Sequence, residues 1–146
     1  MTTICVSRAL RMMVSDSRIA VGSTRAPKSP KMWRLPNCIV GIAGTMYPGQ
    51  QFVQWLPHRK GPRPLGDYEA LALYRDGRLG WWLGRHNETL VEEDFYAIGS
   101  GQDFALGAMQ AMQEMGLKAD PRIAVRCAAR HDVQSEEPIR TLRWVK

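Results

Sequence analysis

The chain has 146 residues, 45% of them hydrophobic, and we expect a single domain over residues 1–146 with a substantial core. Its 20 basic and 14 acidic residues give a net charge of +6, but the basic residues are scattered, which argues against nucleic-acid binding. Cys5, Cys38 and Cys127 share no metal-ligand spacing and indicate buried, reduced thiols. Without a signal-like start or a run of about 18 apolar residues, we expect a cytoplasmic protein that does not enter a membrane.

Two β-hairpins and a short helix are predicted in the first half of the chain. Apolar residues 3–7 and 12–15 flank a turn centred near Ala9, and that register places Thr2 opposite Asp16. Extended chain continues over 19–21 until a segment rich in Gly, Ser and Pro over 22–30. The second hairpin comprises 33–35 and 38–43. A short helix is predicted over 50–56, and the Pro and Gly residues of 58–66 predict a loop.

The second half begins with strands and then changes to helical periodicity. Residues 71–74 and 79–83 flank an Asp-Gly turn and predict a hairpin, and 95–98 predict a further strand. Apolar residues then recur at helical spacing from Ala105 to Met115, with Asp103 as N-cap and Gly116 as the stop. Asp120 followed by Pro opens a second helix to about residue 130, and 138–145 return to strand. This order predicts an α+β fold in which helices cover antiparallel sheets.

The start of the chain offers a nucleophile with its own base. If Met1 is removed, Thr2 carries a hydroxyl oxygen and a free α-amino group on one residue. An α-amino group has a pKa of roughly 7.7–8.0, so near neutral pH an appreciable fraction is uncharged and can accept the hydroxyl proton. Such a residue can act without a histidine.

Five features occur in a distinctive order along the chain: Thr2-Thr3-Ile4, Ser15-Asp16, Lys31, the strand end over 41–45, and residues 97–101 before a helix rich in Ala and Met. The chain thereby resembles the proteasome β-subunit family, above all its bacterial HslV type. The resemblance implies an N-terminal nucleophile (Ntn) hydrolase with a four-layer αββα sandwich, whose subunits form stacked rings around an inner chamber. One helical layer should be reduced, because two helices normally follow the Gly-rich strand end and this chain has room for one short helix.

The same resemblance assigns roles to seven residues. Thr2 would supply the nucleophilic Oγ and the accepting amine, and the charge of Lys31 would favour the neutral amine and the developing alkoxide. Asp16 would hold Lys31 by a charge-assisted hydrogen bond. The Gly44 backbone N–H would donate to the oxyanion. Ser100 would hydrogen-bond the Thr2 amine, and Asp132 with Ser135 would orient it.

These features leave alternatives open. Without Thr2, Asp16 and Lys31 would be interpreted as one surface ion pair among many. The function that the resemblance implies is a threonine peptidase in a homo-oligomeric ring, acting on peptides or unfolded proteins and fed in some cases by an AAA+ unfoldase. The alternatives are a ring or scaffold protein without catalytic activity, and an amidase of the same chemistry acting on a small amide. No cofactor and no metal are expected.

The shortened stretch after Thr45 has a consequence for assembly. Prolines at 48, 57, 62 and 64 restrict helix formation there, so one sheet face should be thinly covered. Exposed apolar faces usually mark interfaces. We therefore expect neighbouring subunits or a partner to cover this face through Phe52, Trp55 and Leu56.

Overall fold

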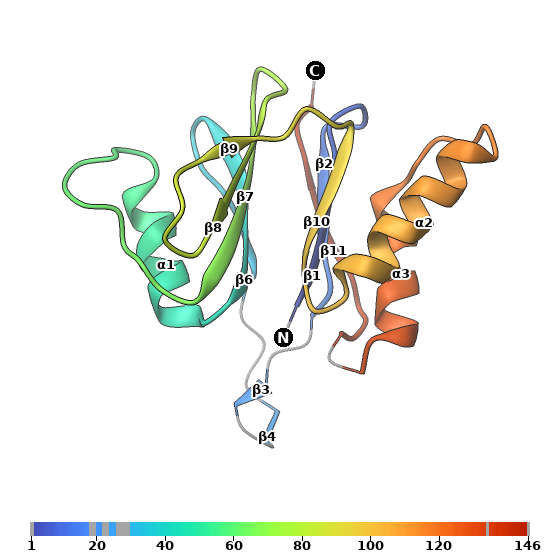
Figure 1. Cartoon of the computed structure of the whole chain (residues 1–146), viewed down its shortest axis with the longest axis horizontal. Helices are drawn as coiled ribbons and strands as arrows, with labels where there is room; N and C mark the ends of the chain where they lie inside the picture. Colours follow the sequence, from blue (N-terminus) through green and yellow to red (C-terminus); the bar gives the residue numbers. More distant parts are fainter. Residues whose placement is uncertain (1, 18–19, 22–23, 26–29, 134, 146) are drawn as a thin grey trace.

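The protein is built from two facing antiparallel sheets with helices on their outer sides (Figure 1). The computed structural model describes residues 2–17, 20–21, 24–25, 30–133 and 135–145. From one side of the molecule to the other, the layers are helix α1, a five-stranded sheet, a four-stranded sheet, and helices α2 and α3. This arrangement confirms the predicted α+β fold and its four αββα layers.

The four-stranded sheet carries the beginning of the chain. Its strands follow the order β10-β1-β2-β11, with β1 (Thr3–Ser7) between β2 (Met12–Ser15) and β10 (Phe95–Gly99), and β11 (Arg140–Arg143) at the edge beside β2. The predicted first hairpin is confirmed at both strands. The last strand is shorter than the predicted 138–145.

The five-stranded sheet has the order β5-β6-β7-β8-β9. Its strands are β5 (Met32–Arg34), β6 (Cys38–Gly44), β7 (Tyr68–Tyr74), β8 (Leu79–Leu83) and β9 (Thr89–Leu90). Both hairpins predicted here are confirmed within a few residues. The strand β9 was not predicted, because two exposed residues carry no alternation of apolar and polar side chains.

A separate small hairpin joins β3 (Ala20–Val21) to β4 (Thr24–Arg25). The expected extended residues 20–21 are β3, whereas residue 19 lies outside the described residues. The strand β4 falls in the segment rich in Gly, Ser and Pro, where no strand was predicted. Of the Gly-, Ser- and Pro-rich stretch, residues 22–23 and 26–29 also lie outside the described residues.

The main core lies between the two sheets and is made of fully buried apolar side chains from both. Ile4 and Met13 of the first sheet face Ile39 and Leu71 of the second. A side chain at Gly41 of β6 would meet Ile4 and Met13 across this layer, so the close approach of the sheets here requires a residue without a Cβ. This close packing fixes β1 against β6, and with it the residue that precedes β1.

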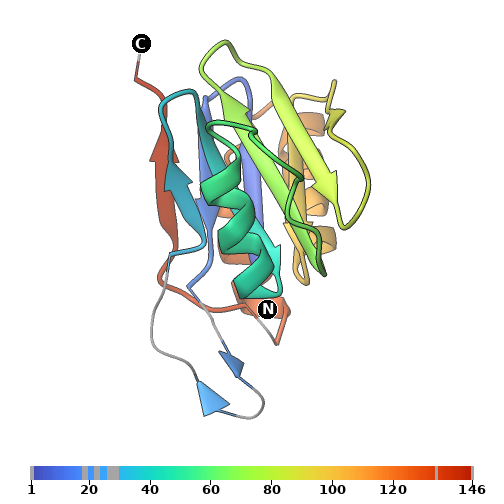
Figure 2. The same cartoon turned by 90° about the vertical axis from the view of Figure 1, so that its left-hand side faces the viewer.

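The helix α1 (Met46–Trp55) covers the outer face of the five-stranded sheet (Figure 2). It starts four residues before the predicted 50–56 because Pro48 occupies its first turn, where a missing N–H breaks no helical hydrogen bond. Phe52 and Leu56 are 0% and 4% exposed, and Phe52 packs edge-on against Trp82 at 5.0 Å between ring centroids. The expectation that Phe52 and Leu56 contact a neighbouring subunit is therefore wrong, since both fill the protein's own core. Trp55 is half-buried.

The helices α2 (Gln102–Glu114) and α3 (Pro121–His131) cover the four-stranded sheet through Met109, Ala124 and Val125. Asp120 caps α3 as predicted, because its carboxylate accepts the Arg122 N–H at 2.9 Å. Asp103 does not cap α2. The N-cap is residue 101, and Asp103 lies inside the first turn. There its negative charge interacts favourably with the positive end of the helix dipole. In the described residues, α1 alone covers one sheet while two helices cover the other, which confirms the reduced helical layer.

The three cysteines differ in how deeply they are buried. Cys5 and Cys38 are buried and unbridged as predicted, whereas Cys127 is only half-buried because its side chain lies on the outer side of α3.

Within the part of the chain that the structure describes, no helix combines the length and the apolar character that crossing a membrane requires.

Candidate active site

Thr2 lies immediately before β1 and is 6% exposed. Its neighbour Thr3 pairs with Gly99, the last residue of β10. Gly99 has φ +95°, and a Cβ at this position would overlap the carbonyl oxygen of Thr2. Glycine at 99 therefore allows the backbone of β10 to approach Thr2 directly.

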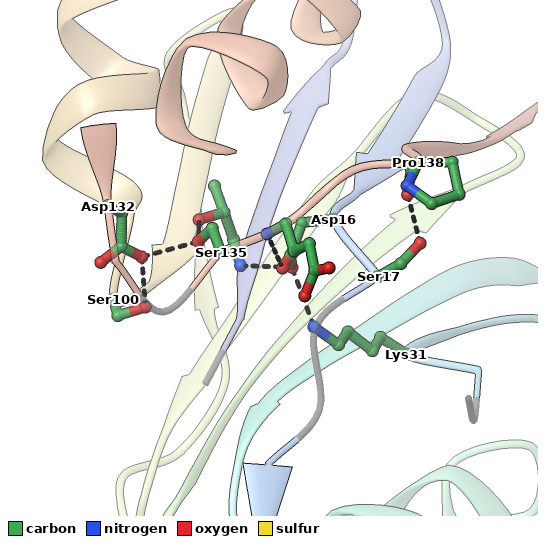
Figure 3. Close-up of polar contacts among 9 residues, drawn as sticks. Asp16, Ser17, Lys31, Ser100, Asp132, Ser135 and Pro138 are labelled. Atoms are coloured by element: carbon green, nitrogen blue, oxygen red, sulfur yellow. Dashed lines mark hydrogen bonds and ion pairs between the residues drawn. The ribbon is translucent and has the colours of Figure 1, made fainter. Parts of the chain in front are cut away.

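The Asp16 carboxylate is buried and accepts several hydrogen bonds (Figure 3). Its Oδ1 accepts the Lys31 ammonium and the Thr3 backbone N–H, each at 2.9 Å, and its Oδ2 accepts the Glu136 N–H at 3.0 Å. The side chains of Asp16 and Lys31 are 0% and 6% exposed. A buried charge persists only where it is paired and hydrogen-bonded. The alternative of a surface ion pair is thus wrong.

The register of the first hairpin differs by one residue from the prediction. Ile4 pairs with Ser15, and the Asp16 N–H donates to the Thr3 carbonyl at 3.1 Å, so Asp16 lies beside Thr3 rather than opposite Thr2. The reason is a four-residue turn whose last residue, Arg11, has φ +55°. Asp16 therefore reaches the backbone that joins Thr2 to Thr3, and it ties Lys31 to that point.

Lys31 precedes β5 and is anchored by its own backbone, because its carbonyl accepts the Ile42 N–H of β6 at 2.9 Å. Burial lowers the pKa of the Lys31 ammonium, and the Asp16 carboxylate opposes this shift without cancelling it. Arg140 lowers the pKa further by like-charge repulsion. Lys31 is consequently a fixed cation that releases its proton more readily than a free lysine.

A chain of hydroxyl groups connects Thr3 to the end of α3. Asp132, the C-cap of α3, accepts the hydroxyls of Ser100 and Ser135 at 2.7 and 2.6 Å, and the hydroxyls of Ser135 and Thr3 lie 2.6 Å apart (Figure 3). Since Ser135 has one proton and gives it to Asp132, the Thr3 hydroxyl is the donor to Ser135. The network links β1, the start of α2 and the end of α3.

This network brings together three of the predicted residues and one that sequence reasoning missed. Ser100, Asp132 and Ser135 meet at one place, and the missed member is Thr3, whose polar side chain is fully buried. The sequence signal that could have indicated Thr3 is its position directly after Thr2, as a second threonine at the start of the chain. The proton of Ser100 goes to Asp132, so Ser100 could meet the Thr2 amine only as an acceptor, and that contact stays a prediction.

A cavity of about 370 Å³ opens beside Thr2 and Gly44. Gly44 ends β6 with φ +105°, and a Cβ there would lie 2.6 Å from the Asp67 carbonyl oxygen, so this turn requires glycine. The cavity brings Thr2, Gly44 and Ser100 together, while the role of the Gly44 N–H remains a prediction. Sequence reasoning missed the residues that β7 and β8 contribute. The cavity is lined by Thr2, Ala43, Gly44, Asp67, Tyr68, Glu69, Leu83, Gly84, Gly99 and Ser100.

Metal binding finds no support in the described residues. No three His, Cys, Asp or Glu side chains within them are grouped so that they could hold a metal ion. The buried ion pair consists of the Asp16 carboxylate and the Lys31 ammonium, and a protonated amine has no lone pair with which to bind a metal ion.

Two facing antiparallel sheets lie between helical layers, and Thr2 lines a cavity at one end of their strands, which together define an αββα sandwich with a candidate site next to the start of β1. The chain has the HslV-like, proteasome β-type fold. Similar solved structures are eukaryotic HslV from Trypanosoma brucei (24% identity, TM-score 0.73, covering 98% of this chain and 100% of that chain) and Thiobacillus denitrificans BPH (19%, 0.71, 97% and 96%). BPH in complex with epoxomicin is similar to the same degree (20%, 0.71, 97% and 97%). No protein-family model matches the sequence, and no curated protein does.

Because Gly99 lies in close contact with Thr2, we expect a side chain at position 99 to destabilise the protein. Gly99→Ala should lower the free energy of unfolding by roughly 2–4 kcal/mol, because the methyl group overlaps the Thr2 carbonyl in a backbone conformation already unfavourable for alanine. Gly77→Ala is the matched control. Its φ of +93° imposes the same backbone strain, but nothing lies within 4 Å of the added Cβ, so it should cost about 1 kcal/mol. Urea denaturation measures both, and equal losses would contradict the contact.

Proposed function

We propose that this protein is an N-terminal threonine peptidase that hydrolyses peptide bonds with Thr2 after removal of Met1. The observation that carries the proposal is the buried Asp16–Lys31 pair, held at 2.9 Å and tied to the backbone next to Thr2. A pair that costs desolvation energy and stabilises little is typical of a functional site. The likeness to BPH in complex with epoxomicin supports the same activity.

The proposed reaction uses groups of one residue and its surroundings. The Thr2 amine takes the hydroxyl proton, and Oγ attacks the substrate carbonyl to form a tetrahedral intermediate. The Gly44 N–H stabilises the oxyanion, a contribution worth about 3 kcal/mol for a single donor. The protonated amine then gives its proton to the leaving amine, and the acyl group remains on Oγ. Water, activated by the same amine, hydrolyses this ester and restores Thr2.

Lys31 acts in this proposal through its charge. An ammonium near the Thr2 amine favours the neutral form of that amine and the developing alkoxide. The buried Asp16 carboxylate keeps the ammonium in place with a charge-assisted hydrogen bond. The hydroxyl network of Thr3, Ser135, Asp132 and Ser100 holds the backbone around Thr2.

The direct test is labelling of the purified protein. N-terminal sequencing should give Thr2 as the first residue, and an epoxyketone such as epoxomicin should add covalently to Thr2, because the reagent needs a hydroxyl and a free amine on the same residue. The protein should also release fluorophore from peptide amides, and the adduct should stop this. Active protein that retains Met1 would contradict the proposal. An assembled protein with Thr2 exposed as first residue but without adduct or hydrolysis would favour the inactive scaffold.

The lowered pKa of Lys31 predicts the alkaline limit of activity. The value of kcat/KM should rise with pH as the Thr2 amine loses its proton and fall again at a pH below 10.5, because Lys31 loses its charge earlier than a free lysine. Peptide hydrolysis measured across this range tests the predicted pH profile of kcat/KM. Circular dichroism at each pH shows whether the fold persists. A plateau that extends to pH 10.5 would argue against a charged Lys31 in the mechanism.

We also propose that the chain assembles into a homo-oligomeric ring, which an AAA+ unfoldase in the cytoplasm would supply with unfolded chains. Exposed apolar side chains beside α1 and the cavity, namely Met46, Tyr47, Leu65 and Leu83, support self-association. Sedimentation at micromolar concentration should show a species several times the 16.5 kDa of the chain. A folded monomer as the single species would rule out the ring and the chamber.

A further inference from the structure

We infer that the cavity beside Thr2 selects substrates with a positively charged side chain, lysine or arginine, close to the scissile amide. The inference rests on the proposed function and names its substrate class. Two carboxylates, those of Asp67 and Glu69, line the same cavity as Thr2 and Gly44. The position of these carboxylates, their lack of cationic partners and the cavity's apolar walls all favour a basic side chain.

Strand geometry places Glu69 on the inner face of its sheet. Tyr68 and Ala70 belong to the cluster under α1, whereas Leu71 belongs to the core between the sheets, so the alternating Glu69 faces the inner side. Glu69 pairs with Ala43 of β6 on one side and with Leu83 of β8 on the other. Its side chain is half-buried, and Oε2 accepts the Trp81 indole N–H at 3.2 Å. This hydrogen bond fixes the carboxylate at the cavity.

Asp67 lies two residues before Glu69 in the sequence and beside Gly44 in the structure. Its carbonyl accepts the Thr45 N–H at 2.8 Å, which holds the Asp67 backbone against the end of β6. The Asp67 side chain is exposed, so its carboxylate is hydrated, and water and salt screen its attraction for a cation more than they would that of a buried group. Together the two residues place negative charge on the wall of the cavity that also contains Thr2 and Gly44.

Neither carboxylate has a cationic partner among the residues that the structure describes. The basic side chain of Arg63 comes near, but its guanidinium donates to the carbonyls of Gly84 and His86 at 3.2 and 2.7 Å. In a chain with a net charge of +6, these two carboxylates make the cavity wall locally negative. They attract a cation that the rest of the protein would repel.

The remaining walls suit the stem of a long basic side chain. Ala43, Tyr68 and Leu83 line the cavity beside the carboxylates, and Leu83 is 42% exposed. Lysine and arginine bury their methylene groups along apolar surface while the charged end meets a carboxylate. An acidic side chain would instead face two like charges, so the cavity both attracts the basic residue and repels its opposite.

The test compares fluorogenic peptide amides that carry Arg, Leu or Glu at each position on the acyl side of the cleaved bond. At one position, kcat/KM for Arg should exceed that for Glu by about a hundredfold, with Leu between them. Glu69→Gln keeps an oxygen acceptor for Trp81 and should reduce the Arg-to-Glu ratio by about tenfold. Asp67→Asn should reduce the ratio less, and its effect should fade as salt is raised.

Glu114→Gln is the matched control, because this glutamate is exposed at the far end of α2 and should leave the ratio unchanged. Hydrolysis of Leu peptides with equal rates for Arg and Glu at every position would overturn the inference and leave the proposed function standing. A preference for Arg that survives both Glu69→Gln and Asp67→Asn would overturn it too. If no peptide is cleaved and no epoxyketone adds to Thr2, the proposed function fails, and the inference fails with it.

Discussion

Thr2→Ala should reduce peptide hydrolysis by more than about a thousandfold while the protein remains folded. The substitution removes the oxygen that attacks the substrate but keeps the amine, the buried Asp16–Lys31 pair and the close contact with Gly99. Turnover of a fluorogenic peptide measures the loss, and intact mass confirms that processing of Met1 still occurs.

Two companion variants make this result specific to the nucleophile. Thr2→Ser retains a hydroxyl and an amine and should keep at least about a tenth of the turnover. Thr3→Ser preserves the hydroxyl that donates to Ser135 and should have a similarly small effect. If Thr2→Ala kept turnover within tenfold of the unmodified protein, the nucleophile would have to be sought elsewhere.

Lys31→Ala should also abolish hydrolysis, and it should in addition lower the free energy of unfolding by about 3–5 kcal/mol. The substitution leaves the Asp16 carboxylate buried without its cation, which is more costly than removing both charges. Lys31→Arg should restore little activity, because a planar guanidinium does not replace a compact ammonium. Residual turnover above about a tenth, a loss of under ~1.4 kcal/mol in barrier height, would show that the charge of Lys31 is not required.

A double variant separates the catalytic from the structural effect of this pair. Combining Lys31→Met with Asp16→Asn removes both buried charges, so stability should recover most of what Lys31→Ala lost. Activity should not recover, because the charge beside Thr2 is still missing. Arg78→Ala serves as the control, since the Arg78–Asp76 pair is exposed and its loss should change neither stability nor turnover. Recovery of turnover in the double variant would mean that Lys31 matters only for folding.

Local sequence patterns were sufficient to predict most strands and helices. Two apolar runs on either side of the Asp76-Gly77 turn predicted the hairpin of β7 and β8, and Asp120 before a proline predicted the start of α3. The start of α1 was missed because proline is normally a helix breaker and only its position in the first turn makes it acceptable. The strand β9 was missed because it exists through pairing with β8 and has no pattern of its own.

The sequence by itself indicated which residues could do chemistry, because Thr2, Asp16 and Lys31 occur in an order that resembles a known family. Local patterns predicted the hairpin that precedes Asp16. Tertiary structure decided where they meet. The one-residue shift in the hairpin moved Asp16 to Thr3, because register follows from the turn and from packing between the sheets. Burial of the Asp16–Lys31 pair depends on the same packing.

The residues that line the cavity show most clearly what could not be predicted from the sequence. Asp67 and Glu69 lie more than sixty residues from Thr2 in the sequence, and nothing local to them indicates a site. They reach Thr2 only because β7 pairs with β6 and β6 packs across the core from β1. Long-range pairing of this kind is fixed by which apolar faces must be buried together, and a single sequence does not encode that choice in any one window.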